Sequence, residues 1–500
     1  MTSRILSDPS GAMTGQPAAE LDFVNSLGSW SQASGPVYRR LANGLRSAVL
    51  RGDLEPGCRV PAERNLARLL AVSRTTVVAA YEALRQEGWL ETRQGSGTRV
   101  RSAPRRAAPT GDEPPSFRRH PVYRSLIEGS GGTIEFLGAH LPGAGAIPGE
   151  LVSLKEGIAR LARDHGYLPA GLPELRRAIA ARLDARGLPT REDQILVTSG
   201  AQQAIGLVAQ LFLQKGDAVA LESPTYLGAM DIFTNAGAHL VPLPVGERGV
   251  RPEALRETVH RASPRLVYLV PTFHNPTGAL VPEPVRREMA RIADETDVPF
   301  VEDDTLADLT LGAEPPPPIA AFARTAPVLT IGSLSKVLWG GLRIGWIRAP
   351  EPILARLTRL KILTDLGCSV LSQLAAVELL GRIEAIRRAR RREVRTKYSR
   401  MAALLKRLLP SWSWTPPAGG LSLWVKLPHG DATGFAQIAL RHGVAIVPGP
   451  LASPDGGGGD RLRLPFVHDA GTMTEGVQRL ARAWRAYSPE LRAEKTSLIV

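Results

Sequence analysis

The segment VLTIGSLSKVLWGGLRIGWI, residues 328–347, decides how the larger part of this chain is built. Its two ends, Val328–Ile331 and Ile344–Ile347, are short, apolar and rich in β-branched residues, as buried strands are. The turn between them, Ser333–Arg343, carries two hydroxyls, one amine and one guanidinium. Open α/β sheets hold their ligands at the ends of such strands, so this turn is the first candidate site.

Four more strands of the same kind are expected before this segment. They are Ile195–Thr198, Ala218–Leu221, Leu266–Val270 and Pro299–Glu302. Helical stretches separate most of them, and this alternation predicts a mainly parallel sheet covered by helices on both faces. The chain then turns helical and ends in a smaller mixed block, with Leu421–Leu427 and Arg461–Phe466 as expected strands. The predicted fold class is α/β with a smaller C-terminal α/β subdomain.

Composition restricts the class of protein. The 500 residues are 43% hydrophobic and 22% charged, which is ordinary for a globular protein. No apolar run approaches the roughly 18 residues that a membrane helix needs, and Glu20 and Asp22 interrupt the only N-terminal stretch that resembles a signal peptide. The two cysteines, Cys58 and Cys368, lack metal-ligand spacing, so no metal site is expected. We expect a cytoplasmic protein that does not contact membranes.

Residues 36–101 form a basic, mainly helical block. Apolar residues at helical spacing predict a helix that starts near Val37 and a short second helix around Leu66. Ser73 is a good N-cap for a third helix, and a glycine-rich turn at 94–97 joins two short strands. The block contains twelve arginines and six acidic residues, and the formal charge of the whole chain is +14, which favours a nucleic-acid partner.

The second and third helices have the spacing of a helix-turn-helix, whose second helix enters the major groove of DNA. The residues expected at the DNA are Arg64, Ser73, Arg74, Thr75, Thr76, Gln94 and Gly95. Arg74 can pair bidentately with a guanine, the two threonines after it can reach phosphates or bases, and Arg64 is placed for the DNA backbone. The glycine-rich turn would lie against the minor groove. The alternative is a small helical domain used for protein contacts.

Changes of composition divide the chain into segments. The predicted segments are a tail 1–35, the block 36–101, a linker 102–125, the α/β part 126–488 and a tail 489–500. The first tail has a short piece at Leu21–Leu27 that could be ordered. The linker combines prolines with arginines and small residues, which is typical of a semi-rigid connection.

Three further motifs lie at or just beyond predicted strand ends, as Lys336 does. Thr198–Gln202 passes from a strand into a helix, and its small residues let backbone N–H groups approach a phosphate. Glu302–Asp304 ends a strand with carboxylates that can keep a pyridine nitrogen protonated. His274–Gly278 follows a strand, and Asn275 within it can donate to a ring hydroxyl. Each motif is common alone, but together with a lysine that can form a Schiff base with an aldehyde cofactor they indicate one site.

Two resemblances bring these motifs together. The segment Val37–Val100 resembles the GntR family of winged-helix regulators through five blocks in order, among them Val60–Arg64 and Val72–Val77. The stretch from about Leu137 to Tyr487 resembles the fold-type I aminotransferases, which bind pyridoxal 5'-phosphate (PLP) and have a mainly parallel seven-stranded sheet. A chain that carries both resembles the MocR subfamily of GntR regulators.

The aminotransferase resemblance implies a role for each motif residue. Lys336 would be the catalytic Schiff-base lysine, Asp303 the partner of the pyridine nitrogen, and Asn275 the contact of the ring hydroxyl. Tyr226 would stack on the ring, and Arg463 would clamp the carboxylate of an amino acid. The phosphate would be held by Ala201, Gln202, Ser333, Ser335 and Arg343.

One position departs from the family pattern. The family often places a tyrosine three residues after the aspartate, where its hydroxyl meets the ring oxygen, but this chain has Leu306, which cannot donate. The departure counts against full transaminase chemistry more than against PLP binding. The choice of Asp303 over Asp304 rests on the same spacing, so both remain candidates.

Three functions are compatible with these motifs. The first is a transcription regulator that uses PLP as a sensing cofactor, with PLP, an amino acid or an amine as the effector at Lys336. The resemblance implies a homodimer on a double-stranded DNA operator with two half-sites, the N-terminal block of one chain lying near the core of the other. The second is a working aminotransferase with an accessory DNA-binding block, against which Leu306 argues. The third is a PLP-independent repressor, which the intact motif residues disfavour.

Overall fold

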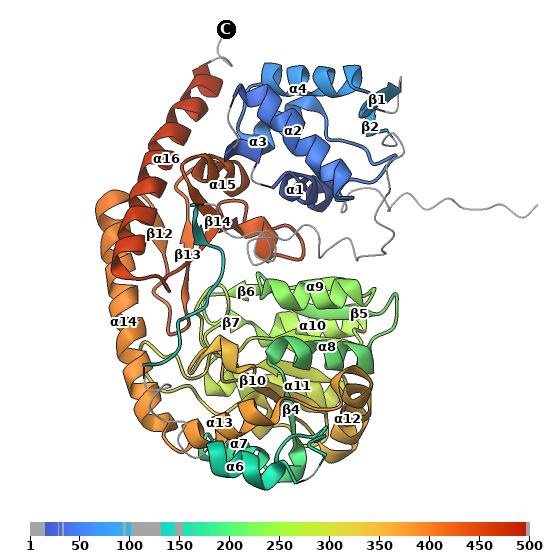
Figure 1. Ribbon diagram of the computed structural model, residues 1–500, viewed down its shortest axis with the longest axis vertical. Helices are drawn as coiled ribbons and strands as arrows, with labels where there is room; N and C mark the ends of the chain where they lie inside the picture. Colours follow the sequence, from blue (N-terminus) through green and yellow to red (C-terminus); the bar gives the residue numbers. More distant parts are fainter. Residues whose placement is uncertain are drawn as a thin grey trace, which may run out of the picture.

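The computed structural model describes residues 16–28, 30–32, 35–93, 97–101, 132–145, 154–163 and 165–496. These residues form three parts: the head (residues 16–101), a large α/β domain and a small α/β subdomain. In Figure 1 the head lies at the top next to the small subdomain, and the large domain lies below.

The head is a winged helix-turn-helix. It consists of α1 (Gln16–Ser26), η1 (Trp30–Gln32), α2 (Val37–Leu50), α3 (Glu63–Leu70), α4 (Arg74–Gln86), β1 (Leu90–Arg93) and β2 (Gly97–Val100). Helices α2, α3 and α4 bury Leu41, Leu66 and Val77 in one core, and β1 pairs with β2 as an antiparallel hairpin. The predicted N-cap is confirmed, because Ser73 Oγ accepts the Thr76 N–H at 3.1 Å.

The segment expected to be mostly a loose tail completes the core of the head. Helix α1 and η1 bury Phe23, Val24 and Trp30. A Cβ at Gly44 of α2 would lie 2.6 Å from Trp30 Cβ, so a glycine there is what lets the tryptophan approach. The expectation fell short because α1 has no pronounced apolar stripe to mark it as a packed helix.

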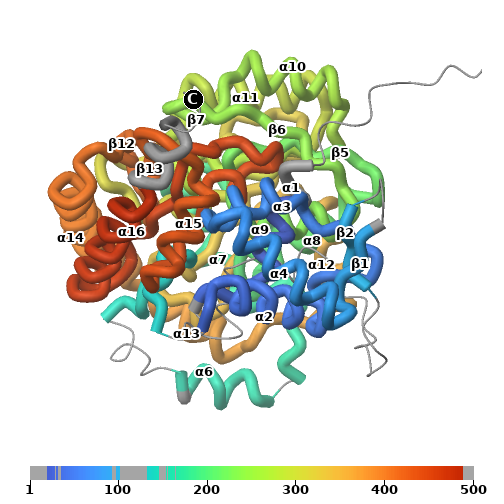
Figure 2. Tube along the Cα trace, turned by 90° about the horizontal axis from the view of Figure 1, so that it is seen from above, coloured from blue at the N-terminus to red at the C-terminus, as the bar shows by residue number. Residues whose placement is uncertain are grey.

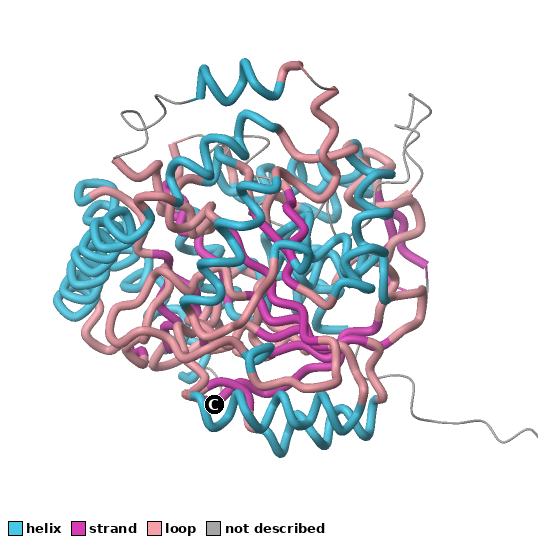
Figure 3. Tube along the Cα trace, turned by 90° about the horizontal axis from the view of Figure 1, so that it is seen from below, coloured by secondary structure: helices cyan, strands magenta, loops and turns pink. Residues whose placement is uncertain are grey.

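The large domain surrounds one sheet. Its strands are β4 (Ile195–Thr198), β5 (Ala218–Ser223), β6 (His239–Gly246), β7 (Gly249–Val250), β8 (Leu266–Leu269), β9 (Phe300–Asp303), β10 (Val328–Ser333) and β11 (Gly345–Arg348). Its helices are α6 (Leu154–Leu161), α7 (Pro173–Ala185), η3 (Glu192–Gln194), α8 (Ala201–Phe212), α9 (Leu227–Asn235), α10 (Pro252–Ala262), α11 (Glu283–Thr296), η4 (Ile319–Ala321), η5 (Gly340–Leu342), α12 (Glu351–Asp365) and α13 (Val370–Leu380). Figure 3 shows the strands in the interior with helices around them.

The sheet has eight strands in the order β4-β11-β10-β9-β8-β5-β6-β7. The neighbours from β10 to β6 run parallel, while β11 and β7 are antiparallel to their neighbours. The mainly parallel sheet is therefore confirmed, with one strand more than the seven expected. The extra strand is β7, whose two residues are too few to show a pattern, and β6 was missed because Pro242 and Pro244 interrupt its apolar run.

The small subdomain is formed by two separate stretches of chain. It consists of β3 (Ile134–Phe136), α14 (Ile383–Leu408), β12 (Ser413–Trp414), β13 (Ser422–Lys426), α15 (Ala432–Arg441), β14 (Val444–Pro448), η6 (Gly449–Ala452), β15 (Arg461–Pro465) and α16 (Ala470–Thr496). Its sheet has the order β12-β13-β15-β14-β3, in which β3 arrives from before the large domain and pairs parallel to β14. Helix α16 continues to Thr496, past residue 489 where a tail was expected.

The head lies against the small subdomain of its own chain. Helix α3 packs on α15, and Figure 2 shows the two next to each other from above. In this structure of one chain the head is therefore near its own core, whereas the family resemblance implied the core of a second chain. No helix within the described ranges has both the length and the apolar composition to cross a membrane.

Candidate functional site

A cavity of about 180 Å³ lies where five strands of the large sheet end. All of the predicted cofactor-binding residues line it: Ala201, Gln202, Tyr226, Asn275, Asp303, Ser333, Ser335, Lys336 and Arg343. They follow β4, β5, β8, β9 and β10, because the same ends of these strands meet at one edge of the sheet. The structure thus brings together motifs that are far apart in the chain.

Lys336 reaches into this cavity from the turn after β10. Its Nζ donates to the Ala139 carbonyl at 2.9 Å. Burial lowers the pKa of Lys336 to about 8, and the positive charge of Arg463 acts in the same direction. A substantial fraction of the amine is therefore neutral near physiological pH, and the neutral amine is the form that attacks an aldehyde.

Asp303, and not Asp304, faces the cavity. The Tyr268 hydroxyl donates to Asp303 Oδ2 at 2.7 Å, and the Thr305 N–H donates to Oδ1 at 3.0 Å. Asp304 turns away and pairs with Arg186. Burial raises the pKa of Asp303, so its carboxylate would be stabilised by a cationic partner inside the cavity, such as a protonated pyridine nitrogen.

The groups next to Lys336 form an anion-binding corner. Helix α8 begins at Ala201 after Gly200, which has φ +117° and leaves no room for a Cβ because Arg343 Nη2 would lie 2.8 Å from it. The Arg343 guanidinium donates to the Ser199 carbonyl, and Ser333 Oγ donates to Ser335 Oγ at 3.0 Å. A helix N-terminus, two hydroxyls and a guanidinium are the donors that a phosphate requires.

An aromatic ring and an amide complete the cavity wall. The Tyr226 hydroxyl donates to Gln202 Oε1 at 2.9 Å, and burial raises the pKa of Tyr226 to about 12. Gln202 is therefore tied to Tyr226 as well as being close to the anion-binding corner. Asn275 Oδ1 is buried and has no hydrogen-bond partner among the described residues. A polar atom left unpaired in a cavity wall fits the bound ring that the sequence predicted, so these residues fit PLP.

Three other residues change what the cavity can bind. Arg463 on β15 is buried, its Nη2 donates to the Leu137 carbonyl at 2.7 Å, and burial lowers its pKa to about 10. His140 lines the cavity, and burial followed by the charges of Lys336 and Arg463 lowers its pKa to about 4. Leu306 also lines the cavity, so the position of the family tyrosine presents an apolar side chain.

Sequence reasoning missed Tyr268 and His140. Tyr268 is the one residue with a polar tip in the strand Leu266–Leu269, and that is the only signal that marked it. His140 was considered only as a metal ligand, for which it lacks partners. Within the described ranges, no three His, Cys, Asp or Glu side chains gather in a metal-binding arrangement.

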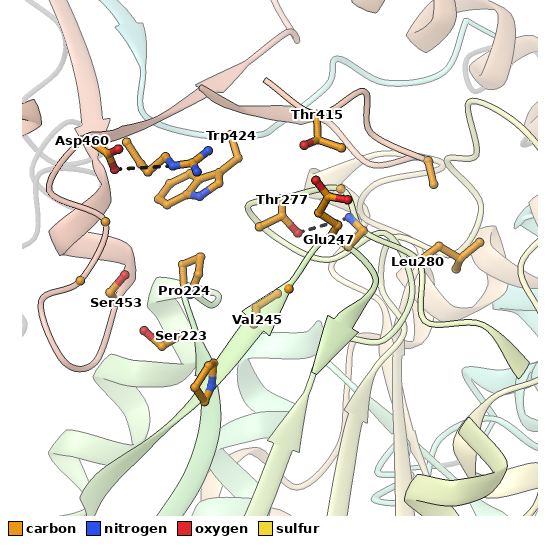
Figure 4. Close-up of a pocket in the computed structure, with 18 of the residues that line it drawn as sticks. Ser223, Pro224, Val245, Glu247, Thr277, Leu280, Thr415, Trp424, Ser453 and Asp460 are labelled. Carbon is orange, nitrogen blue, oxygen red and sulfur yellow. Dashed lines mark hydrogen bonds and ion pairs between the residues drawn. The ribbon is translucent and has the colours of Figure 1, made fainter. Parts of the chain in front are cut away.

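A second cavity of about 610 Å³ lies between the large domain and the small subdomain. In Figure 4, Trp424 and Asp460 of the small subdomain face Ser223 and Val245 of the large domain across it. Ser223 Oγ donates to Asp455 Oδ1 at 2.8 Å, which links the two parts at one side of the cavity. The boundary between the two parts is therefore partly open, although the large domain's Phe273 also packs into the core of the small subdomain.

The head presents the predicted DNA-contacting residues of its helices to solvent. Arg64, Ser73, Arg74 and Thr75 are exposed and Thr76 is half-buried, while Gln94 and Gly95 lie outside the described residues. Arg74 Nη2 lies 3.3 Å from Glu63 Oε2, a pair with a 59% exposed arginine side chain. Exposed pairs of this kind are weak, so Arg74 can exchange Glu63 for another partner. Ser73 also caps α4, so its hydroxyl has a structural role.

Comparison with known proteins assigns both parts of the chain. Residues 152–480 match the family "Aminotransferase class I and II", and residues 37–100 match "Bacterial regulatory proteins, gntR family". A Rhizobium meliloti protein described as probable rhizopine catabolism regulatory protein MocR is 32% identical over 395 residues, which cover 75% of this chain and 78% of that protein. The chain belongs to the MocR-like GntR regulators. It is therefore a DNA-binding regulator with an aminotransferase-like domain.

Two further relatives delimit this family assignment. The Thermus thermophilus 2-aminoadipate transaminase is 37% identical over 366 residues, or 70% of this chain and 90% of the enzyme. The crystal structure of LysN, an α-aminoadipate aminotransferase from Thermus thermophilus, in complex with N-(5'-phosphopyridoxyl)-L-leucine, has a TM-score of 0.65 and 35% identity, with coverage of 72% of this chain and 94% of LysN. The aminotransferase-like domain of this MocR-like chain is thus similar to proteins that act as enzymes.

Proposed function

We propose that this chain is a transcription regulator that binds PLP covalently at Lys336 and changes its DNA binding when the cavity is occupied. The observation that carries the proposal is a buried lysine with a pKa of about 8, placed among anion donors and opposite Asp303, in the same chain as a helix-turn-helix. PLP supplies an aldehyde and an electron-withdrawing ring when it is bound.

Each cavity residue has one task in this proposal. Lys336 provides the neutral amine, while Ser333, Ser335, Arg343 and the N-terminus of α8 hold the phosphate. Asp303, oriented by Tyr268 and Thr305, holds a proton on the pyridine nitrogen. The amide of Asn275 bonds the ring oxygen, and Tyr226 lies against the ring. Ala201 and Gln202 close the phosphate end.

The effector is PLP itself, an amino acid or an amine. Arg463 is the residue for an amino acid carboxylate, because it is buried, positively charged and has a free Nε among the described atoms. His140 lies in the wall of the same cavity and is neutral in its resting state, given its pKa of about 4. Since two of the relatives above act on 2-aminoadipate by name, L-2-aminoadipate is the first amino acid to test.

We also propose that the protein is a cytoplasmic homodimer that binds two operator half-sites. Large exposed apolar side chains lie on neighbouring parts of the large domain: Ile158, Tyr167, Trp339, Ile362, Leu363, Leu366 and Leu371. The face runs past the cavity, because Trp339 directly precedes Gly340 of its wall. An apolar face of this kind fits a second copy of the chain, and two heads would then reach two half-sites.

The second candidate is a working aminotransferase with an accessory head. It is favoured by the complete set of cavity residues and by the 37% identity to the 2-aminoadipate transaminase. Leu306 argues against it, because the ring oxygen then lacks one donor. Multiple turnover of L-2-aminoadipate with a 2-oxo acid would establish this candidate, and a single turnover or none would exclude it.

The deciding experiment is a gel-shift on the intergenic DNA next to the gene. The full chain is compared with and without PLP, and then with L-2-aminoadipate added. We expect salt-sensitive DNA binding whose affinity changes when PLP is present. Protein that stays colourless and binds DNA equally well with PLP would leave a PLP-independent repressor, and protein that binds no DNA would contradict the proposal as a whole.

A further inference from the structure

One arginine joins the head to the small subdomain. Arg441, the last residue of α15, donates from Nη1 to the Leu70 carbonyl and from Nη2 to the Ala71 carbonyl, both at 2.9 Å. Leu70 ends α3 and Ala71 is its C-cap, so neither carbonyl is used within the helix. The guanidinium bonds both, and its positive charge faces the negative end of the α3 dipole.

These carbonyls belong to the turn of the helix-turn-helix. Residues 71–73 connect α3 to α4, and Arg74 follows directly. Ala71 also packs against the apolar core of the small subdomain, and a Cβ on Gly434 of α15 would lie 3.5 Å from the Arg68 carbonyl. Arg441 therefore holds the turn, while α4 remains on the far side of the head (Figure 1).

Helix α15 is connected to the strand that carries the carboxylate clamp. Strand β14 begins at Val444, shortly after Arg441, and Val447 of β14 pairs with Arg463 of β15. Trp424, in the wall of the larger cavity, is the other cross-strand neighbour of Arg463. The head, α15 and the Arg463 strand thus form one packed unit that meets the large domain across the cleft of Figure 4.

From this geometry we propose that Arg441 is the residue that couples the head to the ligand cleft. The head moves as one body with the small subdomain, so a shift of the subdomain on the large domain reorients α4. This inference rests on the proposed function, since an effector at Lys336 and Arg463 bridges the large domain and the small subdomain. A ligand that favours one cleft geometry then favours one head orientation.

The first test measures the contact itself by hydrogen exchange in the full chain. The variant is Arg441→Met, which keeps length and removes the guanidinium. The control is Arg479→Met, because Arg479 Nη1 donates at 3.2 Å to the Gly443 carbonyl within the same subdomain and not to the head. We expect the amides of the turn, including Val72, to exchange about tenfold faster in Arg441→Met, and unchanged in the control.

Arg441→Lys guards against a folding defect. One ammonium cannot reach both carbonyls with the fixed fork of a guanidinium, so exchange at the turn should lie between those of the wild type and Arg441→Met. Exchange at the turn that is the same in the wild type and both variants would overturn the proposal. Faster exchange throughout the small subdomain in both variants would also overturn it, since Arg441 would then be a general stabiliser.

The second test measures the coupling. DNA affinity is determined for the PLP-free and PLP-loaded full chain, and cofactor retention is checked by absorbance. We expect the ratio of the two affinities, about 5–150-fold in coupled systems, to fall to within about twofold of unity in Arg441→Met while PLP-free binding persists. An unchanged ratio would overturn the coupling. If the wild type itself does not respond to PLP, the proposed sensing fails, and the exchange result still decides whether Arg441 holds the head.

Discussion

The cavity around Lys336 and the DNA-facing side of the head use the same chemical groups in opposite surroundings. In the cavity, burial lowers the pKa of Lys336 to about 8 and that of Arg463 to about 10. On the head, the Arg74 side chain is 59% exposed and pairs only loosely. Buried charges are tuned by desolvation and by fixed neighbours, whereas exposed charges attract a partner through solvent and are screened by salt. The comparison teaches that pH should govern the cavity and salt the head.

The sharpest way to break this comparison is to remove the cavity amine. In Lys336→Ala, PLP followed by borohydride should leave the chain unlabelled, because no other described lysine lines the cavity. Peptide mapping checks this result. DNA binding of the PLP-free variant should match the wild type, and Lys215→Ala, an exposed lysine outside the cavity wall, serves as the labelled control. Labelling of the Lys336→Ala variant would contradict the assignment.

The next largest effect concerns the head. Arg74→Ala should cost about 1–3 kcal/mol on preferred DNA and relax the preference at one base pair, because a bidentate contact is lost. Arg64→Ala should weaken binding to all sequences and reduce the salt slope by about 1, as expected for a phosphate contact. Gel-shifts at several salt concentrations check both. Equal losses on all sequences for Arg74→Ala would place that residue at the backbone.

The pH dependence should separate the two regions. Capture of PLP requires the neutral Lys336 amine, and since its pKa is lowered to about 8, that form predominates above this pH. Below it, the capture rate should fall about tenfold per pH unit. Stopped-flow absorbance over a pH range that brackets this pKa measures the rate. A midpoint near that of an ordinary lysine would mean that burial does not tune this amine.

The smallest effect should come from Leu306→Tyr. A hydroxyl at this position of the cavity wall could donate to the ring oxygen and stabilise its anionic form. We expect the pH midpoint of the bound cofactor's absorbance to move down by about one unit or less. Leu306→Phe is the matched control, since it adds the ring without the hydroxyl. Equal midpoints in both variants would show that the leucine is not what limits this domain.

Much of the site was predictable because its residues lie in local patterns. Strand ends are marked by apolar runs that stop, and Lys336, Asp303, Asn275 and Ala201 all follow such runs directly. The predictions were less complete where local pattern is weak. Helix α1 lacks an apolar stripe, β7 has two residues, and β6 contains two prolines, so their structure depends on what they pack against.

The sequence by itself determined the two-part architecture, the helix-turn-helix and the motifs that meet in the cavity, because periodicity, caps and turn residues act over a few neighbouring positions. Only the tertiary structure decided that Asp303 faces the cavity while Asp304 pairs with Arg186, that Tyr268 holds Asp303, and that Arg441 grips the turn before Arg74. Those choices depend on which side chains distant segments bring within hydrogen-bond distance. Local spacing contains no record of such distances, since they arise only when helices and strands pack.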